Sequence, residues 1–159
     1  MDGGGFPNRR DGANISLLGR MAAICDTYDT LIDGNDDSAG VDPGAALQTM
    51  SGMAGALDAM LMKYFIGAIG VYPVGSLVLL RSRRLALVVD QSADNPARPK
   101  VCAFYAVTTT KMVTPVVIDL AQCFGEDAIE SLADPDSFCI TDFPRVRDRL
   151  FASASLSRA

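Results

Sequence analysis

The feature that most constrains the fold of this chain is a change in the spacing of its apolar residues at about residue 76. Before this point, apolar side chains recur every three or four residues, which is the period of an amphipathic α-helix. After it, short runs of branched and aromatic residues alternate with turn-forming residues, as is typical of β-strands. The pattern therefore predicts an α+β fold in which about three helices precede a small antiparallel β-sheet and a terminal helix.

The longest helical pattern covers residues 15–33. Asn14 or Ser16 can cap its start, and Gly34 with Asn35 can end it. Two further helices are expected at about 43–50 and at 57–69. In the last of these we expect the stripe formed by five residues to lie in the core: Met60, Leu61, Tyr64, Phe65 and Ala68. Residues 34–43 are polar and acidic and predict a flexible loop, without the glycine and terminal glutamate of a calcium-binding loop.

Two carboxylates interrupt the first helical pattern. Asp26 and Asp29 are three residues apart, so they lie close together on one side of the helix. Asp26 follows four apolar residues, and we expect it to lie near the core, where a carboxylate needs a partner, a hydrogen bond or a metal. The simpler alternative is a pair of partly solvated helix carboxylates.

The second half of the chain predicts four strands, at 77–80, 85–90, 99–106 and 113–118. The last of these is expected at a sheet edge, because Pro115 cannot donate a hydrogen bond to a neighbouring strand. Short helices are expected at 126–132 and 143–151, followed by a frayed tail at 152–159. The expected domains are a helical region at 1–75, a β-rich extension at 76–151 and the tail.

Composition excludes several classes of function. The chain of 159 residues contains no histidine, which rules out Ser-His-Asp and Cys-His nucleophiles and metal sites built on imidazole. Its net charge of −5 argues against a nucleic-acid-binding surface. The four cysteines show no CxxC spacing, and the longest apolar stretch is too interrupted to cross a membrane. We therefore expect a cytoplasmic protein with neither nucleic acid nor membrane as a partner.

Five segments together resemble a known family. In chain order they are DGGGFP at 2–7, LGRMAAICDTYDTL at 18–31, IGVYPVGSL at 69–77, RLALVV at 84–89 and NPARP at 95–99. Their order and spacing resemble the C-terminal part of an HD-GYP domain over about residues 2–107, and more weakly to about residue 142. The resemblance implies a helical, metal-dependent phosphodiesterase family of bacterial cyclic di-GMP signalling, whose members hold divalent metals such as iron or manganese.

The family motifs can be carried over residue by residue. The segment formed by Gly5, Phe6 and Pro7 falls where the family has its Gly-Tyr-Pro motif, with phenylalanine in place of tyrosine. This replacement keeps the aromatic packing and removes the hydroxyl. The resemblance implies that Asp26 matches a metal-ligating aspartate and that Asp29 matches the aspartate one turn later.

Other family features are missing from this sequence. Asn35 and Ser38 stand where the resemblance implies two cations that hold substrate phosphates, and Asp36 and Asp37 add negative charge nearby. The resemblance also places the metal-binding histidines in helices that precede the glycine motif, inside which this sequence begins. We therefore expect a truncated, degenerate segment that holds no metal cofactor and does not hydrolyse cyclic di-GMP by itself.

Three interpretations remain open. The first is a non-catalytic remnant that acts through protein contacts, either with diguanylate-cyclase-type (GGDEF) proteins or with itself, because its helices would expose apolar faces. The second is one half of a split phosphodiesterase that needs a separate histidine-bearing half. The third is a decayed or excised fragment without a selected role. The replacements at Asn35 and Ser38 favour the first.

Overall fold

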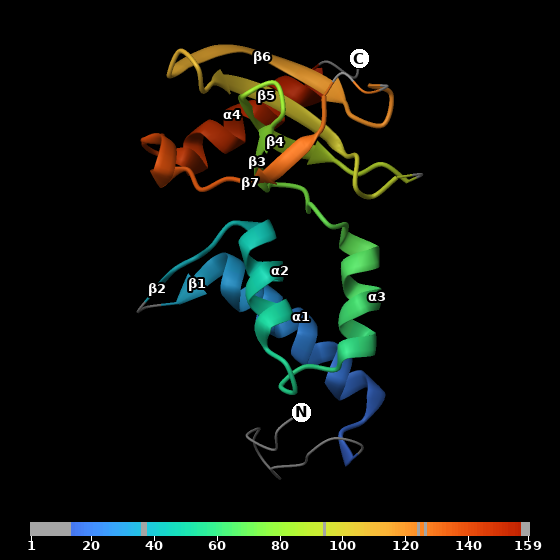
Figure 1. The fold of residues 1–159 in the computed structure, drawn as a ribbon. Coiled ribbons are helices and arrows are strands. Elements are labelled where there is room, and N and C mark those ends of the chain that lie inside the picture. The colour runs from blue at the N-terminus through green and yellow to red at the C-terminus, as the bar shows by residue number, and fades with distance from the viewer. Residues whose placement is uncertain (1–13, 36–37, 94, 124, 126, 157–159) are drawn as a thin grey trace. The chain divides into compact units, whose positions relative to one another are not determined.

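The computed structural model describes residues 14–35, 38–93, 95–123, 125 and 127–156 (Figure 1). The chain divides into two compact units. The helical unit extends to Val41 and continues through Ala45–Ile69, and the sheet unit holds Asp42–Gly44 and the chain from Gly70 onward. The expected α+β class is confirmed, with three helices before a five-stranded antiparallel sheet and one helix after it. The expected domains at 1–75, 76–151 and 152–159 stay a prediction.

The helical unit is built from three helices, α1 (Leu17–Asp33), α2 (Pro43–Gly52) and α3 (Ala59–Ile69). Their shared core is small and consists of four buried side chains: Ile24, Leu47, Met50 and Met62. Tyr28 of α1 and Phe65 of α3 close this core with an edge-to-face contact, their ring centres 5.2 Å apart. A core of this size leaves much of the surface of α1 and α3 uncovered, each having one buried residue.

The ends of α1 follow from local side-chain chemistry. Ser16 caps the helix, because its Oγ accepts a hydrogen bond from the backbone N–H of Gly19 at 3.1 Å. Gly34 ends the helix with a φ of 76°, a conformation that favours glycine. The chain then forms a pair of two-residue strands, β1 (Gly34–Asn35) and β2 (Ser38–Ala39), where the sequence predicted only a loop.

The expected core stripe on α3 is wrong in part. Met60 and Tyr64 are 69% and 70% exposed, whereas Met62, which was not part of the expected stripe, is buried. The helix begins at Ala59 because Asp58 caps it, accepting hydrogen bonds from the backbone N–H groups of Met60 and Leu61. The apolar arc of α3 is wider than the surface its neighbours cover, so spacing alone did not identify the buried side.

The sheet unit contains five strands: β3 (Leu77–Leu80), β4 (Arg84–Asp90), β5 (Lys100–Ala106), β6 (Lys111–Asp119) and β7 (Ile129–Leu132). They pair antiparallel in the order β6-β5-β4-β3-β7. The four strands predicted from the sequence are therefore confirmed. Within the described sheet, β6 lies at an edge, as Pro115 predicted.

Both faces of the central strands are apolar. Leu85, Leu87 and Phe104 point to the face that helix α4 (Phe143–Leu156) covers (Figure 1). Leu150 of α4 is buried in the same cluster. Val88 and Val101 point to the opposite face, where Leu120 is also buried. Because successive residues of a strand alternate between faces, two-sided burial explains the continuous apolar runs of β4 and β5.

Two predicted elements near the C-terminus are wrong. The segment expected as a helix at 126–132 contains β7, because its backbone pairs with β3, Val78 lying opposite Leu132. The last helix does not end at 151 but continues to Leu156, where Ala154 is buried against the unit, so the expected frayed tail is helical over 152–156. None of the described helices combines the length and apolarity needed to cross a membrane.

Candidate functional site on helix α1

One stripe of α1 is exposed along its whole length. We call it the α1 stripe, and it consists of Leu18, Met21, Ala22, Cys25, Asp26 and Asp29. These positions are spaced by three and four residues, so they lie above one another on the helix surface. The core side of the helix carries Ile24 instead, which is only 2% exposed. The stripe is thus apolar over its first two turns and acidic at its end.

The structure corrects the expected position of Asp26. Its carboxylate is exposed rather than close to the core, and so is that of Asp29. The four apolar residues that precede Asp26 are distributed around the helix, and of these only Ile24 points inward. Neither carboxylate makes a side-chain hydrogen bond or ion pair with another described residue. The simpler alternative, two solvated carboxylates on one side of the helix, describes them correctly.

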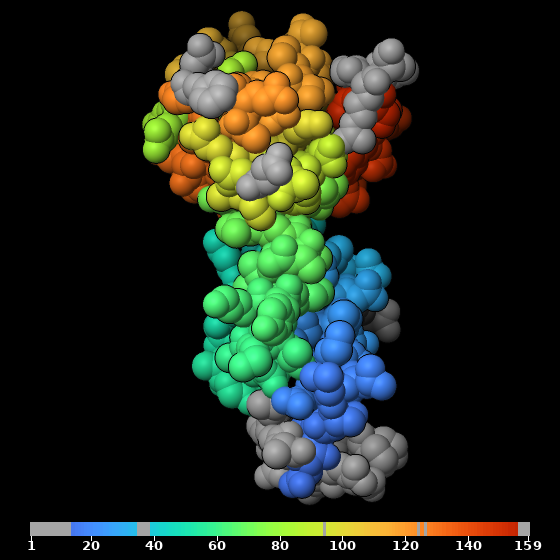
Figure 2. Space-filling model, turned by 90° about the vertical axis from the view of Figure 1, so that its right-hand side faces the viewer, coloured from blue at the N-terminus to red at the C-terminus, as the bar shows by residue number. Residues whose placement is uncertain are grey.

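A shallow apolar groove borders the α1 stripe. It has a volume of about 250 Å³ and lies between α1 and α3, which Figure 2 shows side by side at the surface. Met21 and Cys25 contribute to it from α1, and Tyr64 and Ala68 contribute from α3. The exposed Leu18 and Met60, at 77% and 69%, extend the apolar surface on the two helices. Contiguous exposed apolar surface of this kind marks an interaction site more often than a surface in contact with solvent alone.

An ion pair joins the two helices that form the groove. Arg20 of α1 donates from Nη1 to Oδ2 of Asp58 at 2.6 Å. The backbone N–H of Leu61, the Arg20 guanidinium and the N–H of Met60 together hold the pKa of the Asp58 carboxyl below its usual value. Since Asp58 also caps α3, one carboxylate both starts this helix and ties it to α1.

The other residues predicted for the site have different positions. Asn35 and Ser38 are brought together, since they lie opposite each other in the β1–β2 pair after α1. Gly5, Phe6 and Pro7 lie outside the described residues. Asp26 as a vestigial metal position and the loss of phosphate-binding cations at Asn35 and Ser38 stay predictions.

The donor set around Asp26, as far as the described residues supply it, does not fit a resident metal ion. In the described ranges no three histidine, cysteine or carboxylate side chains come together as a metal site would require. Two carboxylates three residues apart on one helix supply too few ligands for a catalytic divalent metal.

The groove residues Met21 and Cys25 were not singled out from the sequence as a binding surface. The sequence nevertheless contains a pattern that could have identified them, because the apolar residues of α1 form two stripes instead of one. A first stripe with Ile24 and Tyr28 faces the core, and a second with Leu18, Met21 and Cys25 does not. A helix that is apolar on two sides requires a covering partner on each.

Comparison with known proteins finds two similarities. Residues 1–61 match the family model of the HD domain. These residues are therefore similar to the HD domain family. The chain is also 33% identical over 129 residues to a cyclic di-GMP phosphodiesterase of Pseudomonas aeruginosa. These findings confirm the resemblance to HD-GYP proteins.

The match to the Pseudomonas relative covers most of this chain but only part of the relative. It covers 81% of this chain but 31% of the length of the Pseudomonas relative. In this chain, the match to the Pseudomonas relative, over 129 residues, is longer than the match to the HD domain model, which ends at residue 61. No solved structure matches the chain.

Proposed function

We propose that these 159 residues form a non-catalytic HD-GYP segment that acts through protein contacts made by the α1 stripe. The exposed, partly acidic stripe and the adjoining apolar groove carry this proposal. An apolar helix face of this extent is costly to leave in water and is stabilised when a partner covers it. The favoured partner is a diguanylate-cyclase-type (GGDEF) protein in the cytoplasm, and a second copy of the chain is the alternative occupant.

The lack of catalysis by this chain alone follows from its donor set. A metal-dependent phosphodiesterase needs several ligands to hold its ions and to generate a nucleophilic hydroxide at neutral pH. The sequence contains no histidine, and Asp26 has no ligand set beside it among the residues that the structure describes. Asn35 and Ser38 are neutral, so they offer substrate phosphates no charge-assisted hydrogen bond from a cation. The activity named for the Pseudomonas relative would therefore require residues that this chain does not contain.

Metal binding and hydrolysis of cyclic di-GMP by the purified chain test the absence of catalysis. We expect no stoichiometric manganese or iron after incubation with either metal, and no turnover. The variant Asp26→Ala should match the parent in both measurements, and its stability should change little because the side chain is exposed. Bound metal together with hydrolysis that is lost in Asp26→Ala would contradict the proposal.

A second candidate function is one half of a split phosphodiesterase. The observation that favours it is the exposure of Asp26, whose carboxylate is accessible to ligands from another polypeptide. The test adds the part of the Pseudomonas relative outside the match, as a separate fragment, to this chain in the presence of manganese. Hydrolysis that needs both polypeptides and is lost in Asp26→Ala would establish this function. Hydrolysis that is absent, or present in the fragment alone, would exclude it.

A further inference from the structure

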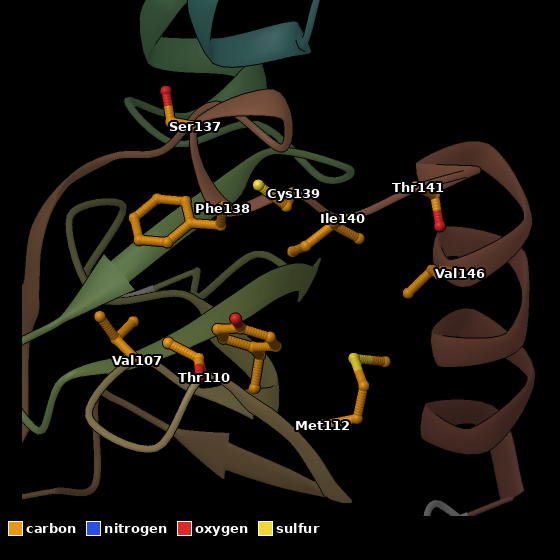
Figure 3. Close-up of a pocket in the computed structure, with 10 residues that line it drawn as sticks. Val107, Thr110, Met112, Ser137, Phe138, Cys139, Ile140, Thr141 and Val146 are labelled. Carbon is orange, nitrogen blue, oxygen red and sulfur yellow. The ribbon is translucent and has the colours of Figure 1, made fainter.

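A cavity of about 640 Å³ lies in the sheet unit, distinct from the α1 stripe. Its walls come from three places: the β5–β6 turn and the adjoining strand ends, the segment 137–141, and the first turns of α4. Figure 3 shows Phe138, Cys139 and Ile140 on one side of it, Val107, Thr110 and Met112 on another, and Val146 projecting from α4. We call this cavity the β5–α4 pocket.

The chemistry of the β5–α4 pocket suits a neutral ligand. Its volume falls within the range of about 300–1,000 Å³ that small-molecule sites occupy. The lining contains aliphatic, aromatic and sulfur-containing side chains and a few hydroxyls, and none of the lining residues carries a charge. A charged ligand would lose its hydration in this pocket without gaining an opposite charge.

Tyr105 supplies the polar group that such a ligand would need. The residue lines the pocket, and its hydroxyl makes no hydrogen bond with another described residue. This oxygen is not among the buried polar atoms that lack a partner, so water reaches it. A tyrosine hydroxyl in this position can donate a hydrogen bond to an acceptor on a ligand that enters the pocket.

The walls of the pocket also contain unusual backbone geometry. Four non-glycine residues in the described ranges have positive φ, and three of them lie at this pocket or next to it: Thr110 at 50°, Cys139 at 53° and Asp142 at 54°. This conformation is disfavoured for side chains with a Cβ, and most of all for a β-branched residue such as threonine. Strained backbone of this kind gathers at ligand-binding sites more than elsewhere.

We propose that the β5–α4 pocket binds a small, neutral, mainly apolar molecule whose carbonyl or ether oxygen accepts a hydrogen bond from the Tyr105 hydroxyl. Val107, Met112, Ile140 and Val146 contact the apolar body of this ligand. The site is separate from the proposed protein contacts of α1, and neither proposal depends on the other.

The test uses the neutral fluorescent ketone 6-propionyl-2-(dimethylamino)naphthalene, which has an aromatic body and one carbonyl acceptor. Titrated into the full chain, it should bind saturably at one site, with the emission change that accompanies transfer from water. Tyr105→Phe should weaken binding about fivefold to tenfold, as expected for one lost hydrogen bond. Thr141→Trp, which fills the pocket from an exposed position, should weaken it by about tenfold or more.

The groove between α1 and α3 is the competing apolar site, and Ala68→Trp is the matched control that fills it. This variant should leave binding unchanged. NMR of ¹³C-labelled methionine methyl groups gives a second test that needs no variant, since Met112 lines the β5–α4 pocket and Met21 lines the groove. We expect the ketone to shift the Met112 signal. Absence of saturable binding, or binding that shifts Met21 and is blocked by Ala68→Trp, would overturn the proposal.

Discussion

The Asp127 carboxylate ties the β3–β4 turn to the segment that leads into β7. It accepts hydrogen bonds from the backbone N–H of Ser82 at 3.1 Å and from the Ser82 hydroxyl at 2.6 Å. Arg84 adds an ion pair at 3.3 Å, and the Asp127 side chain is only 6% exposed. All of these donors bond to the buried Asp127 carboxylate, so its removal would leave them without this acceptor.

Asp127→Ala should therefore lower the free energy of unfolding by about 1–3 kcal/mol, the cost of leaving buried donors without an acceptor. Urea denaturation monitored by circular dichroism measures the change. Glu130→Ala is the matched control, because its ion pair with Arg83 is exposed and should contribute less than about 1 kcal/mol. Equal losses in the two variants would show that the Asp127 hydrogen bonds contribute no more than a surface ion pair.

The four cysteines should differ in reactivity. Burial raises the pKa of the Cys102 thiol, which disfavours the reactive thiolate, whereas Cys25 and Cys139 are exposed. In a time course with a thiol-specific reagent at neutral pH, we expect Cys25 and Cys139 to react first and Cys102 only after unfolding. Mass spectrometry of the labelled peptides assigns each thiol. Early labelling of Cys102 would contradict the burial of β5.

The position of Asp26 shows the limit of sequence reasoning for a single residue. Its type and its spacing from Asp29 were sufficient to place both carboxylates on one side of a helix. The side that the core covers could not be predicted, because Ile24 and Cys25 are adjacent apolar residues on different sides of α1. Burial depends on what packs against the helix, and the sequence of the helix alone does not contain that information.

Among the helices and strands, α3 shows most clearly how the start and the packing of an element can depend on one side chain, that of Asp58. Asp58 caps it and pairs with Arg20 of α1, and these contacts lower the pKa of its carboxyl. A lowered native pKa means that the unfolded chain binds more protons in acid. The stabilisation is therefore present above the unfolded value near 3.8 and is lost as pH falls through the lower native pKa.

Asp58→Asn should have a lower melting temperature than the parent at about pH 6, and the difference should shrink below about pH 4. Thermal denaturation of both proteins across this range tests the expectation. Asp29→Asn serves as the control, since Asp29 is exposed and its side chain contacts no described partner by hydrogen bond or ion pair. A difference between Asp58→Asn and the parent that does not vary with pH would show that the charge of Asp58 is unimportant.

The sequence was informative for elements whose residues carry their own periodic pattern. The three N-terminal helices and the strands β3 to β6 were predicted on that basis. The strand β7 was not, because four residues are too few to establish a period, and it is the pairing with β3 that makes them extended. The helical extension to Leu156 was missed for a similar reason, since Ala154 packs against distant residues.

On the scale of the whole molecule, the two units carry different surfaces. The helical unit presents the α1 stripe and its groove, and the sheet unit holds the β5–α4 pocket. Motif order and spacing were sufficient to predict the resemblance to HD-GYP proteins, which the HD domain match and the Pseudomonas relative support. The pocket could not be predicted, because its walls come from segments that are separated in sequence and carry no motif.

The most direct test of the proposed contact function is sedimentation velocity of the chain mixed with a GGDEF-domain diguanylate cyclase. We expect a complex that Leu18→Arg, at the most exposed apolar position of the α1 stripe, weakens by about tenfold or more. Val116→Arg is the matched control, because Val116 is also an exposed apolar residue but lies on β6. It should leave the complex unchanged.

If the chain instead forms a complex with itself that Leu18→Arg weakens, the α1 stripe is still the contact surface. The partner is then a second copy of the chain. The contact function would be contradicted by the absence of both complexes, or by a complex that Leu18→Arg and Val116→Arg affect equally.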